Sequence, residues 1–310
     1  MQITKNILMI EPINFRYNEQ TAVNNYYQKV LDNLTPEMVQ KKALKEFKDL
    51  VIKLEDVGVN VIVVKDTDFP DTPDSIFPNN WVSFHASGKI CLFPMCAENR
   101  RVERRKDIFN TLKNKYFFLV NDIIDLSYFE KENKFLEGTG SMILDRANKI
   151  CYAAISVRTE RISLFEFCKQ FDYKPICFTA NQDVKDKRMP IYHTNVMMCV
   201  ADRFVVICLD SIDNNKERKL VVESILNSGK EIIEISEEQK NRFAGNMLQV
   251  LGDNQIYLIM SESAYNCLDI KQINKIEKHC KIIYSALDTI EACGGGSARC
   301  MMAEVFLPKN

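Results

Sequence analysis

Apolar and polar positions along the chain repeat one order of elements. A polar start leads into a short apolar run, a turn and a second apolar run, and an amphipathic stretch then precedes another strand-like segment. Each unit takes about 55–60 residues, which is too long for common helical repeats and typical of one strand, hairpin and helix. The inner strands of four such units are predicted at Asn79–Phe84, Glu137–Leu144, His193–Val200 and Gly245–Val250.

The amphipathic stretches predict one helix in each unit. In the first unit we expect a basic helix from Arg100 to Lys115 and a closing strand from Tyr116 to Val120. In the later units the helices are expected at Glu160–Phe171, Lys216–Ser228 and Lys271–His279.

A fifth unit is split between the two ends of the chain. The apolar run Met301–Leu307 predicts a short buried strand with no hairpin partner after it. Its natural partner is Asn6–Ile10, which precedes a helix over Thr35–Val57 and a β-branched strand over Val59–Val64. Pairing of the first and last strands would close a ring. The pattern therefore predicts an α/β propeller of five ββαβ-like repeats, with residues 1–310 forming a single catalytic domain.

The amino-acid composition argues against several classes of function for this chain. Of 310 residues, 46% are hydrophobic and 27% charged, as in ordinary globular proteins, and the net charge of -1 gives no bulk attraction to nucleic acid or anionic membranes. No apolar run approaches the ~20 residues of a membrane span. Met1–Lys5 does not resemble a signal peptide, so the odd count of 11 cysteines predicts reduced thiols in the cytoplasm. The cysteine and histidine spacings predict no metal site.

Equivalent positions of a closed ring lie at equivalent distances from its axis. The five inner-strand starts would therefore converge on one cavity, and they include a carboxylate, an imidazole and a thiol: Asn79/Asn80, Glu137, His193, Gly245/Asn246 and Cys300. Three glycines, Gly294–Gly296, precede Cys300 and let a flexible backbone approach a ligand closely. The alternative is that Cys300 is one more buried thiol among 11.

Four motifs resemble a known family. They are the Cys motif Gly294–Met301, Leu136-Glu137-Gly138, His193 and the run Pro73–Asn80. Together, and in this order, they resemble the guanidine-modifying enzyme superfamily of arginine deiminases, dimethylarginine hydrolases and amidinotransferases. The branch of citrulline-utilisation hydrolases is the most similar. The resemblance spans Asn6 to the C-terminus and implies the five-bladed α/β propeller, or pentein, fold.

The resemblance implies a catalytic role for three residues. Cys300 would be the nucleophile, His193 the general acid and base, and Glu137 the carboxylate that orients His193. A thiolate is the competent nucleophile. A glutamate beside a histidine raises the histidine pKa, so we expect His193 to be protonated for departure of an amine. No metal or organic cofactor is implied.

Two asparagines depart from the pattern of the deiminases. Those enzymes bind a guanidinium with two carboxylates, and the matching positions here are Asn80 and Asn195. A buried guanidinium without a carboxylate is costly, whereas a neutral ureido group suits amides that both donate and accept. This favours citrulline over arginine as the substrate.

The opposite end of such a substrate is an α-amino acid. By resemblance, Asp74 would pair with its ammonium group. Arg158, and Arg100 or Arg101, would clamp its carboxylate in a bidentate manner.

The sequence thus predicts a cysteine-dependent hydrolase that converts citrulline to ornithine, ammonia and carbon dioxide through a covalent thio-adduct. One alternative is a deiminase, dimethylarginine-type hydrolase or amidinotransferase acting on a guanidino substrate. Another is a catalytically silent propeller that serves as a binding module. The expected partner is a small amino-acid substrate, with no nucleic acid and no membrane, and the oligomeric state is not inferable.

Overall fold

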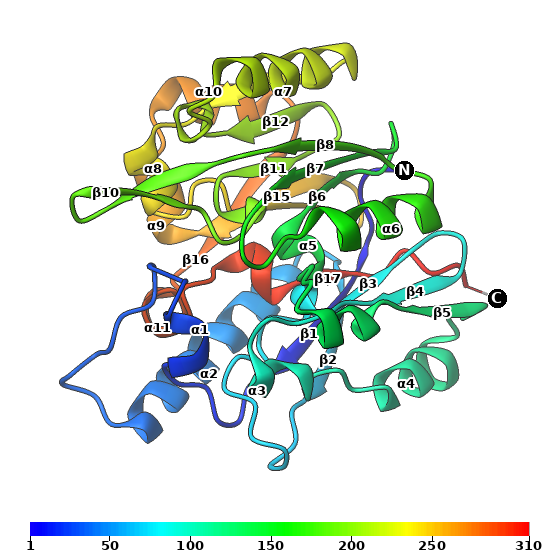
Figure 1. Ribbon diagram of the computed structural model, residues 1–310. Helices are drawn as coiled ribbons and strands as arrows, with labels where there is room; N and C mark the ends of the chain where they lie inside the picture. The colour runs from blue at the N-terminus through cyan, green and yellow to red at the C-terminus, as the bar shows by residue number, and fades with distance from the viewer. Residues whose placement is uncertain (310) are drawn as a thin grey trace.

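The strands of the chain form five three-stranded sheets and one two-stranded hairpin in a computed structural model, which describes residues 1–309 (Figure 1). In each three-stranded sheet the middle strand pairs antiparallel with one neighbour and parallel with the other. In chain order the sheets are β3 (Val82–Phe84), β4 (Lys89–Leu92) and β5 (Asp122–Asp125); β6 (Ile143–Asp145), β7 (Ile150–Ala154) and β8 (Lys174–Phe178); β11 (Met198–Val200), β12 (Phe204–Ile207) and β13 (Glu231–Glu234); β14 (Leu248–Leu251), β15 (Ile256–Ser261) and β16 (Lys281–Ser285); and β17 (Ala303–Glu304), β1 (Asn6–Glu11) and β2 (Asn60–Lys65).

Helices connect the two parallel strands of each sheet, as a right-handed crossover requires. The connecting helices are α2 (Pro36–Glu55), α3 (Glu98–Arg101), α4 (Asp107–Tyr116), α6 (Arg161–Phe171), α7 (Asn215–Asn227), α9 (Glu262–Cys267) and α10 (Ile270–Glu277). In α2 the buried positions Ala43, Phe47 and Leu50 recur at helical spacing, and Thr35 caps its N-terminus through the Met38 amide. Local sequence therefore explains both the start of this helix and the face it buries.

The two ends of the chain meet in one sheet. β1 pairs antiparallel with β17, with Leu8 opposite Ala303, and parallel with β2, with Leu8 opposite Ile62. The predicted pairing of the first and last strands is confirmed. Five sheets of one topology, each with helical crossovers, make an α/β fold of five repeats.

The first repeat differs from its prediction. The expected helix Arg100–Lys115 is divided into α3 and α4, and the expected strand Tyr116–Val120 is wrong because α4 continues to Tyr116. Phe117 then adopts a left-handed φ of 59° that ends the helix, and β5 begins only at Asp122. The apolar residue Phe118 is 1% exposed because it packs into the core, so its hydrophobicity is not a strand signal.

The predicted starts of the inner strands lie in short turns that precede the strands. Asn80 ends the 3-10 turn η1 (Pro78–Asn80), Glu137 precedes α5 (Gly138–Ser141), His193 precedes η3 (Thr194–Val196), and Cys300 lies in η5 (Ala298–Met301). A turn at this point directs a polar side chain away from the sheet that follows. The remaining elements are α1 (Glu19–Ala22), η2 (Ser127–Glu132), the hairpin β9 (Asn181–Val184) and β10 (Lys187–Pro190), η4 (Leu209–Ser211), α8 (Glu237–Asn241) and α11 (Asp288–Gly294).

Three structural features of residues 1–309 bear on other functions. No helix there is both long enough and apolar enough to span a bilayer. No cluster of three or more His, Cys, Asp and Glu side chains within this range is arranged to hold a metal ion. Every cysteine in the chain is a free thiol, as the odd count predicts.

Candidate active site

The turns before the inner strands, together with the segment around α1, enclose one small cavity of about 10 Å³. Cys300 and His193 both line it, although 107 residues separate them in the sequence numbering (300 minus 193). The other lining residues are Thr21, Asn25, Asp74, Phe77, Asn80, Arg100, Arg158, Tyr192 and Gly294–Gly296. The convergence expected from the repeat is therefore present in space.

Glu137 lies behind His193 and is fully buried. Its Oε2 accepts a hydrogen bond from His193 Nε2 at 2.8 Å, and its Oε1 accepts one from the Cys96 amide at 2.9 Å. Burial raises the pKa of Glu137. The charge of Arg158, at 3.4 Å, and the hydrogen bond from His193 lower this pKa by a larger amount, so the net pKa lies well below the ordinary range. Glu137 is therefore ionised and fixes the tautomer in which His193 Nε2 carries the proton.

His193 is neutral in this structure. Burial lowers its pKa to about 4 and outweighs the hydrogen bond and charge of Glu137, which raise this pKa, while the charges of Arg158 and Arg100 add smaller lowering effects. The expectation that Glu137 keeps His193 protonated is wrong. It rested on the charge of Glu137 alone, whereas the loss of hydration of the buried imidazole has the larger effect on the His193 pKa. With Nε2 bonded to Glu137, Nδ1 holds a free lone pair and can act as a base. A Cβ on Gly140 would approach this Nδ1 to 2.8 Å, so the glycine leaves room for the ring.

Cys300 is held by two asparagine amides. Its Sγ accepts hydrogen bonds from Asn195 Nδ2 at 3.2 Å and from Asn246 Nδ2 at 3.3 Å. Asn246 is in turn fixed by the Arg299 amide, which donates to its Oδ1 at 3.0 Å. Both amides are placed to hydrogen-bond the sulfur when it carries negative charge during nucleophilic attack.

Asn246 was not among the site residues predicted from the sequence. It is fully buried and contacts both Cys300 and the backbone oxygen of Asn195, at 3.0 Å. Its signal was available, because it occupies the start of the fourth repeat, where the other repeats place Asn80, Glu137 and His193.

The glycine-rich loop is fixed rather than flexible. Gly295 has a φ of 61°, and Cβ atoms on Gly294 and Gly296 would lie 2.7 and 3.0 Å from the Phe77 ring. Tyr192 Oη donates to the Gly295 oxygen at 2.5 Å, and Asn25 Nδ2 donates to the oxygens of Gly294 and Gly295 at 3.3 Å. The glycines thus permit close packing around Cys300.

Asn80 and Asn195 each leave one polar atom unpaired. Asn80 Oδ1 accepts from Arg100 Nη1 at 2.8 Å, which leaves its Nδ2 without a partner among the described residues. Asn195 Nδ2 donates to Cys300, which leaves its Oδ1 likewise unpaired within residues 1–309. Asn80 lines the cavity and presents a buried donor to it, whereas Asn195 does not line it. A buried polar group without a partner is costly unless a ligand satisfies it.

Asp74 lines the same cavity with one free oxygen. Its Oδ2 accepts from Asn18 Nδ2 at 2.8 Å and from Thr21 Oγ1 at 3.1 Å, whereas Oδ1 has no partner in the described part of the chain. Burial raises the pKa of Asp74 despite the nearby charge of Arg100. A cation at Oδ1 would restore the ionised form.

The three predicted arginines differ in position. Arg158 lines the cavity, lies over the Tyr192 ring at 4.9 Å and donates from Nε to Asn24 Oδ1 at 2.7 Å. Arg100 lines it too, and its Nε and Nη2 donate to Glu103 at 2.8 Å each. Arg101 lies outside the cavity and donates to the Met95 oxygen at 3.1 Å.

The segment of residues 18–29, called the strap below, contributes residues that the sequence did not single out. It contains α1 and lies beside α11, from the opposite end of the chain (Figure 1). Strap residues contact two of the residues that were predicted to bind the substrate. Asn18 and Thr21 contact Asp74, and Asn24 contacts Arg158. Asparagine can donate to a carboxylate and accept from a guanidinium, so this polar segment can cover a cavity of either charge.

Comparisons with known proteins agree with this geometry. The sequence profile of the family described as N,N dimethylarginine dimethylhydrolase, eukaryotic, matches residues 11–307. A search of curated proteins found no match.

Solved structures show a similar fold. Apo ArgZ, an arginine dihydrolase from the ornithine-ammonia cycle in cyanobacteria, superposes with a TM-score of 0.75 at 18% identity over 98% of this chain. The chain spans 41% of that protein's length, but it covers 99% of the separate N-terminal domain of ArgZ bound to product, with a TM-score of 0.73 at 18% identity over 98% of this chain. A dimethylarginine dimethylaminohydrolase variant, in adduct with S-methyl-L-thiocitrulline, gives 0.62 at 14% identity over 97% of this chain and 100% of that one.

Proposed function

The chain belongs to the N,N-dimethylarginine dimethylhydrolase family of the guanidine-modifying superfamily, and we propose that it hydrolyses a C–N bond in the guanidino group of a free arginine-type amino acid. The observation that carries the proposal is the pairing of Cys300, under two amide donors, with the His193–Glu137 pair at one cavity. The names of the similar structures, an arginine dihydrolase and a dimethylarginine hydrolase, support a guanidino substrate.

The chemistry follows from the protonation states. His193 accepts the thiol proton at Nδ1, and Cys300 Sγ forms a bond to the guanidino carbon. The C–N bond to the departing amine breaks as the protonated His193 returns the proton to that nitrogen. Water then attacks the carbon of the thio-adduct with His193 as base, and the C–S bond breaks to release Cys300 and a ureido product.

The amino-acid end of the substrate would lie against Asp74 and the arginines. Asp74 Oδ1 is a free acceptor for the ammonium group. Arg158 would receive the carboxylate by exchanging its hydrogen bond to Asn24, which makes the strap sensitive to substrate binding. Arg100 remains engaged by Glu103 and holds Asn80 in position.

A second candidate substrate is citrulline, and a specific observation favours it. The unpaired atoms are a donor, Asn80 Nδ2, and an acceptor, Asn195 Oδ1. Of these two residues only Asn80 lines the cavity. A ureido group has a carbonyl oxygen for Asn80 Nδ2, whereas a guanidinium has no acceptor for it. Hydrolysis of citrulline would give ornithine, ammonia and carbon dioxide.

Side-by-side turnover of three substrates tests the proposal. Purified protein is given arginine, N,N-dimethylarginine or citrulline, and released ammonia or dimethylamine and the amino-acid product are measured. We expect turnover of at least one guanidino compound and none by Cys300→Ser. Turnover of citrulline alone would select the second candidate, and no turnover of any of the three would contradict both.

We also infer that the five sheets are the blades of a propeller formed by residues 1–310 as one domain. Contacts between inner strands of different sheets support this inference: β17 lies beside β3, and β11 lies beside both β6 and β14. A ring of this kind explains why Asn80, His193 and Cys300, from three different repeats, reach one cavity.

A further inference from the structure

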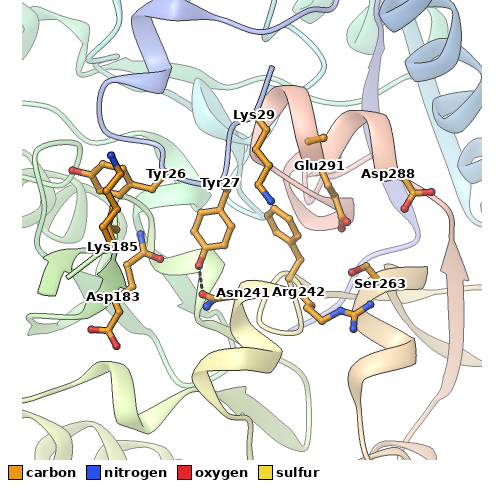
Figure 2. Close-up of a pocket in the computed structure, with 14 residues that line it drawn as sticks. Tyr26, Tyr27, Lys29, Asp183, Lys185, Asn241, Arg242, Ser263, Asp288 and Glu291 are labelled. Carbon is orange, nitrogen blue, oxygen red and sulfur yellow. Dashed lines mark hydrogen bonds between the residues drawn. The ribbon is translucent and has the colours of Figure 1, made fainter. Parts of the chain in front are cut away.

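A second cavity of about 470 Å³, called the outer cavity below, also has strap residues in its wall and does not include Cys300 (Figure 2). The strap contributes Tyr27 and Lys29 to its wall, the hairpin β9–β10 contributes Gln182, and α11 contributes Asp288 and Glu291. None of these residues has a role in the chemistry described above.

The strap lines both cavities. Asn25 faces the catalytic cavity, while Tyr27 and Lys29 face the outer one. Between them, Gln28 Nε2 donates to the Cys293 oxygen at 2.9 Å, and the Lys29 amide donates to the Ala292 oxygen at 2.6 Å. Tyr27 also contacts the Tyr192 ring, at 6.3 Å between centroids. A ligand that holds Tyr27 and Lys29 would therefore hold the segment that covers Cys300.

Ionisable side chains of both signs line the outer cavity without forming ion pairs with one another. One of them, Glu291, is buried, accepts a hydrogen bond from Ser297 Oγ at 2.5 Å and has a pKa that burial raises to about 7. Lys29 and Arg242 form no ion pair with any residue of 1–309, and the same holds for Asp288 and Glu291. Figure 2 shows these four side chains on the same side of Tyr27. A simple anion would meet two acidic groups there, whereas a ligand that carries both charges would find a partner for each.

A buried amide points to a ligand independently of these surface charges. Gln182 is only 3% exposed and lines the outer cavity, but its Nε2 has no partner in the described part of the chain. Its Oε1 accepts from Lys240 Nζ at 3.4 Å, which assigns the free donor to Nε2. An unpaired buried donor costs free energy that an oxygen atom of a ligand would recover.

We propose that the outer cavity binds a free α-amino acid as a zwitterion and that this ligand stabilises the strap over the catalytic cavity. The carboxylate of the ligand faces Lys29 and Arg242, and its ammonium group faces Asp288 and Glu291. The Gln182 amide supplies a further donor, and the rings of Tyr27 and Phe243, which pack on each other with centroids 5.1 Å apart, form one apolar wall for the ligand side chain. This site is distinct from the catalytic cavity, so it does not depend on which C–N bond the chain hydrolyses.

Calorimetric titration of the full chain tests the proposal. Each of the proteinogenic L-amino acids and ornithine is titrated singly into Cys300→Ala, which removes turnover. We expect at least one to bind at two sites per chain. In Cys300→Ala/Arg242→Ala the affinity of one site should fall about tenfold, as expected for loss of a charge-assisted hydrogen bond. Lys187→Ala in the same background is the matched control, because Lys187 is exposed on the same hairpin but does not line the outer cavity.

Three outcomes would overturn the proposal. They are binding of every amino acid at one site only, a second site unchanged by both Arg242→Ala and Lys29→Ala, and equal binding of the N-acetylated amino acid, which would show a simple anion site. A chain that lacks hydrolase activity but has the second site would contradict only the proposed function. A chain that turns over substrate and has one amino-acid site would contradict only this inference.

Discussion

Asn246 Nδ2 donates a hydrogen bond to Cys300 Sγ at 3.3 Å, and Asn195 Nδ2 donates a second at 3.2 Å. The nucleophile is thus held by neutral amides from two other repeats and not by a positive charge. The two donors stabilise negative charge on sulfur. Because they are uncharged, they add no further cation to the site that would repel a guanidinium substrate.

Replacing Asn246 should weaken the nucleophile. In Asn246→Ala we expect the rate of Cys300 alkylation by iodoacetamide at pH 7 to fall about tenfold, because a hydrogen bond to a charged group is lost. Alkylation is followed by mass spectrometry of the Cys300 peptide. Asn227→Ala, at an exposed position on α7, is the matched control. An unchanged alkylation rate in Asn246→Ala would show that this amide does not support the thiolate.

The base form of His193 should set the acid limb of activity. Because burial lowers the His193 pKa to about 4, the neutral base is present above that pH, and kcat/KM should rise through pH 4 and stay level toward neutrality. Glu137→Gln removes the neighbour that raises this pKa and fixes the tautomer, so its acid limb should move lower while kcat falls about 100-fold. A pH–rate profile of both proteins checks this. An acid limb near pH 6.5 would contradict the buried, neutral state of His193.

Asn80 should govern the choice between ureido and guanidino substrates. Asn80→Asp replaces the unpaired Nδ2 by an anionic oxygen, which repels a ureido carbonyl and attracts a guanidinium. We expect the ratio of kcat/KM for arginine to that for citrulline to rise about tenfold or more. Asn79→Asp is the neighbouring control, since Asn79 does not line the catalytic cavity. An unchanged ratio would place substrate discrimination elsewhere.

His85 should make the fold sensitive to mild acid. It is 5% exposed, stacks on Phe171 at 4.0 Å and has a pKa lowered well below its ordinary value, first by burial. The unfolded chain binds a proton near pH 6.5 that the native His85 does not, so its contribution to stability is lost as the pH falls below 6.5.

The variant His85→Phe should remove that dependence. Urea unfolding at pH 7 and pH 5 is measured for both proteins, and the loss of unfolding free energy between these values should be smaller in the variant. Equal losses in the two proteins would show that His85 is not the group that titrates.

The repeat and the catalytic residues could be predicted from the sequence because their signals are local. Apolar runs of strand length, helix caps such as Thr35, and polar residues before each apolar run mark the elements wherever the chain carries them. Even the pairing of β1 with β17 followed, since a terminal strand without a hairpin partner needs one. The prediction failed where an apolar residue served the core instead of a strand, as Phe118 does.

Only the tertiary structure decided the states of the catalytic groups. Hydration loss and charges from other repeats make His193 neutral, and no pattern along the chain reports either quantity. The same holds for the strap, whose asparagines acquire roles only when α1 lies against α11 and Arg158. The sequence by itself determined which side chains meet, because order and period are local properties. The protonation states of these side chains, their further hydrogen-bond partners and the second cavity depend on burial and on neighbouring charges, which exist only after folding.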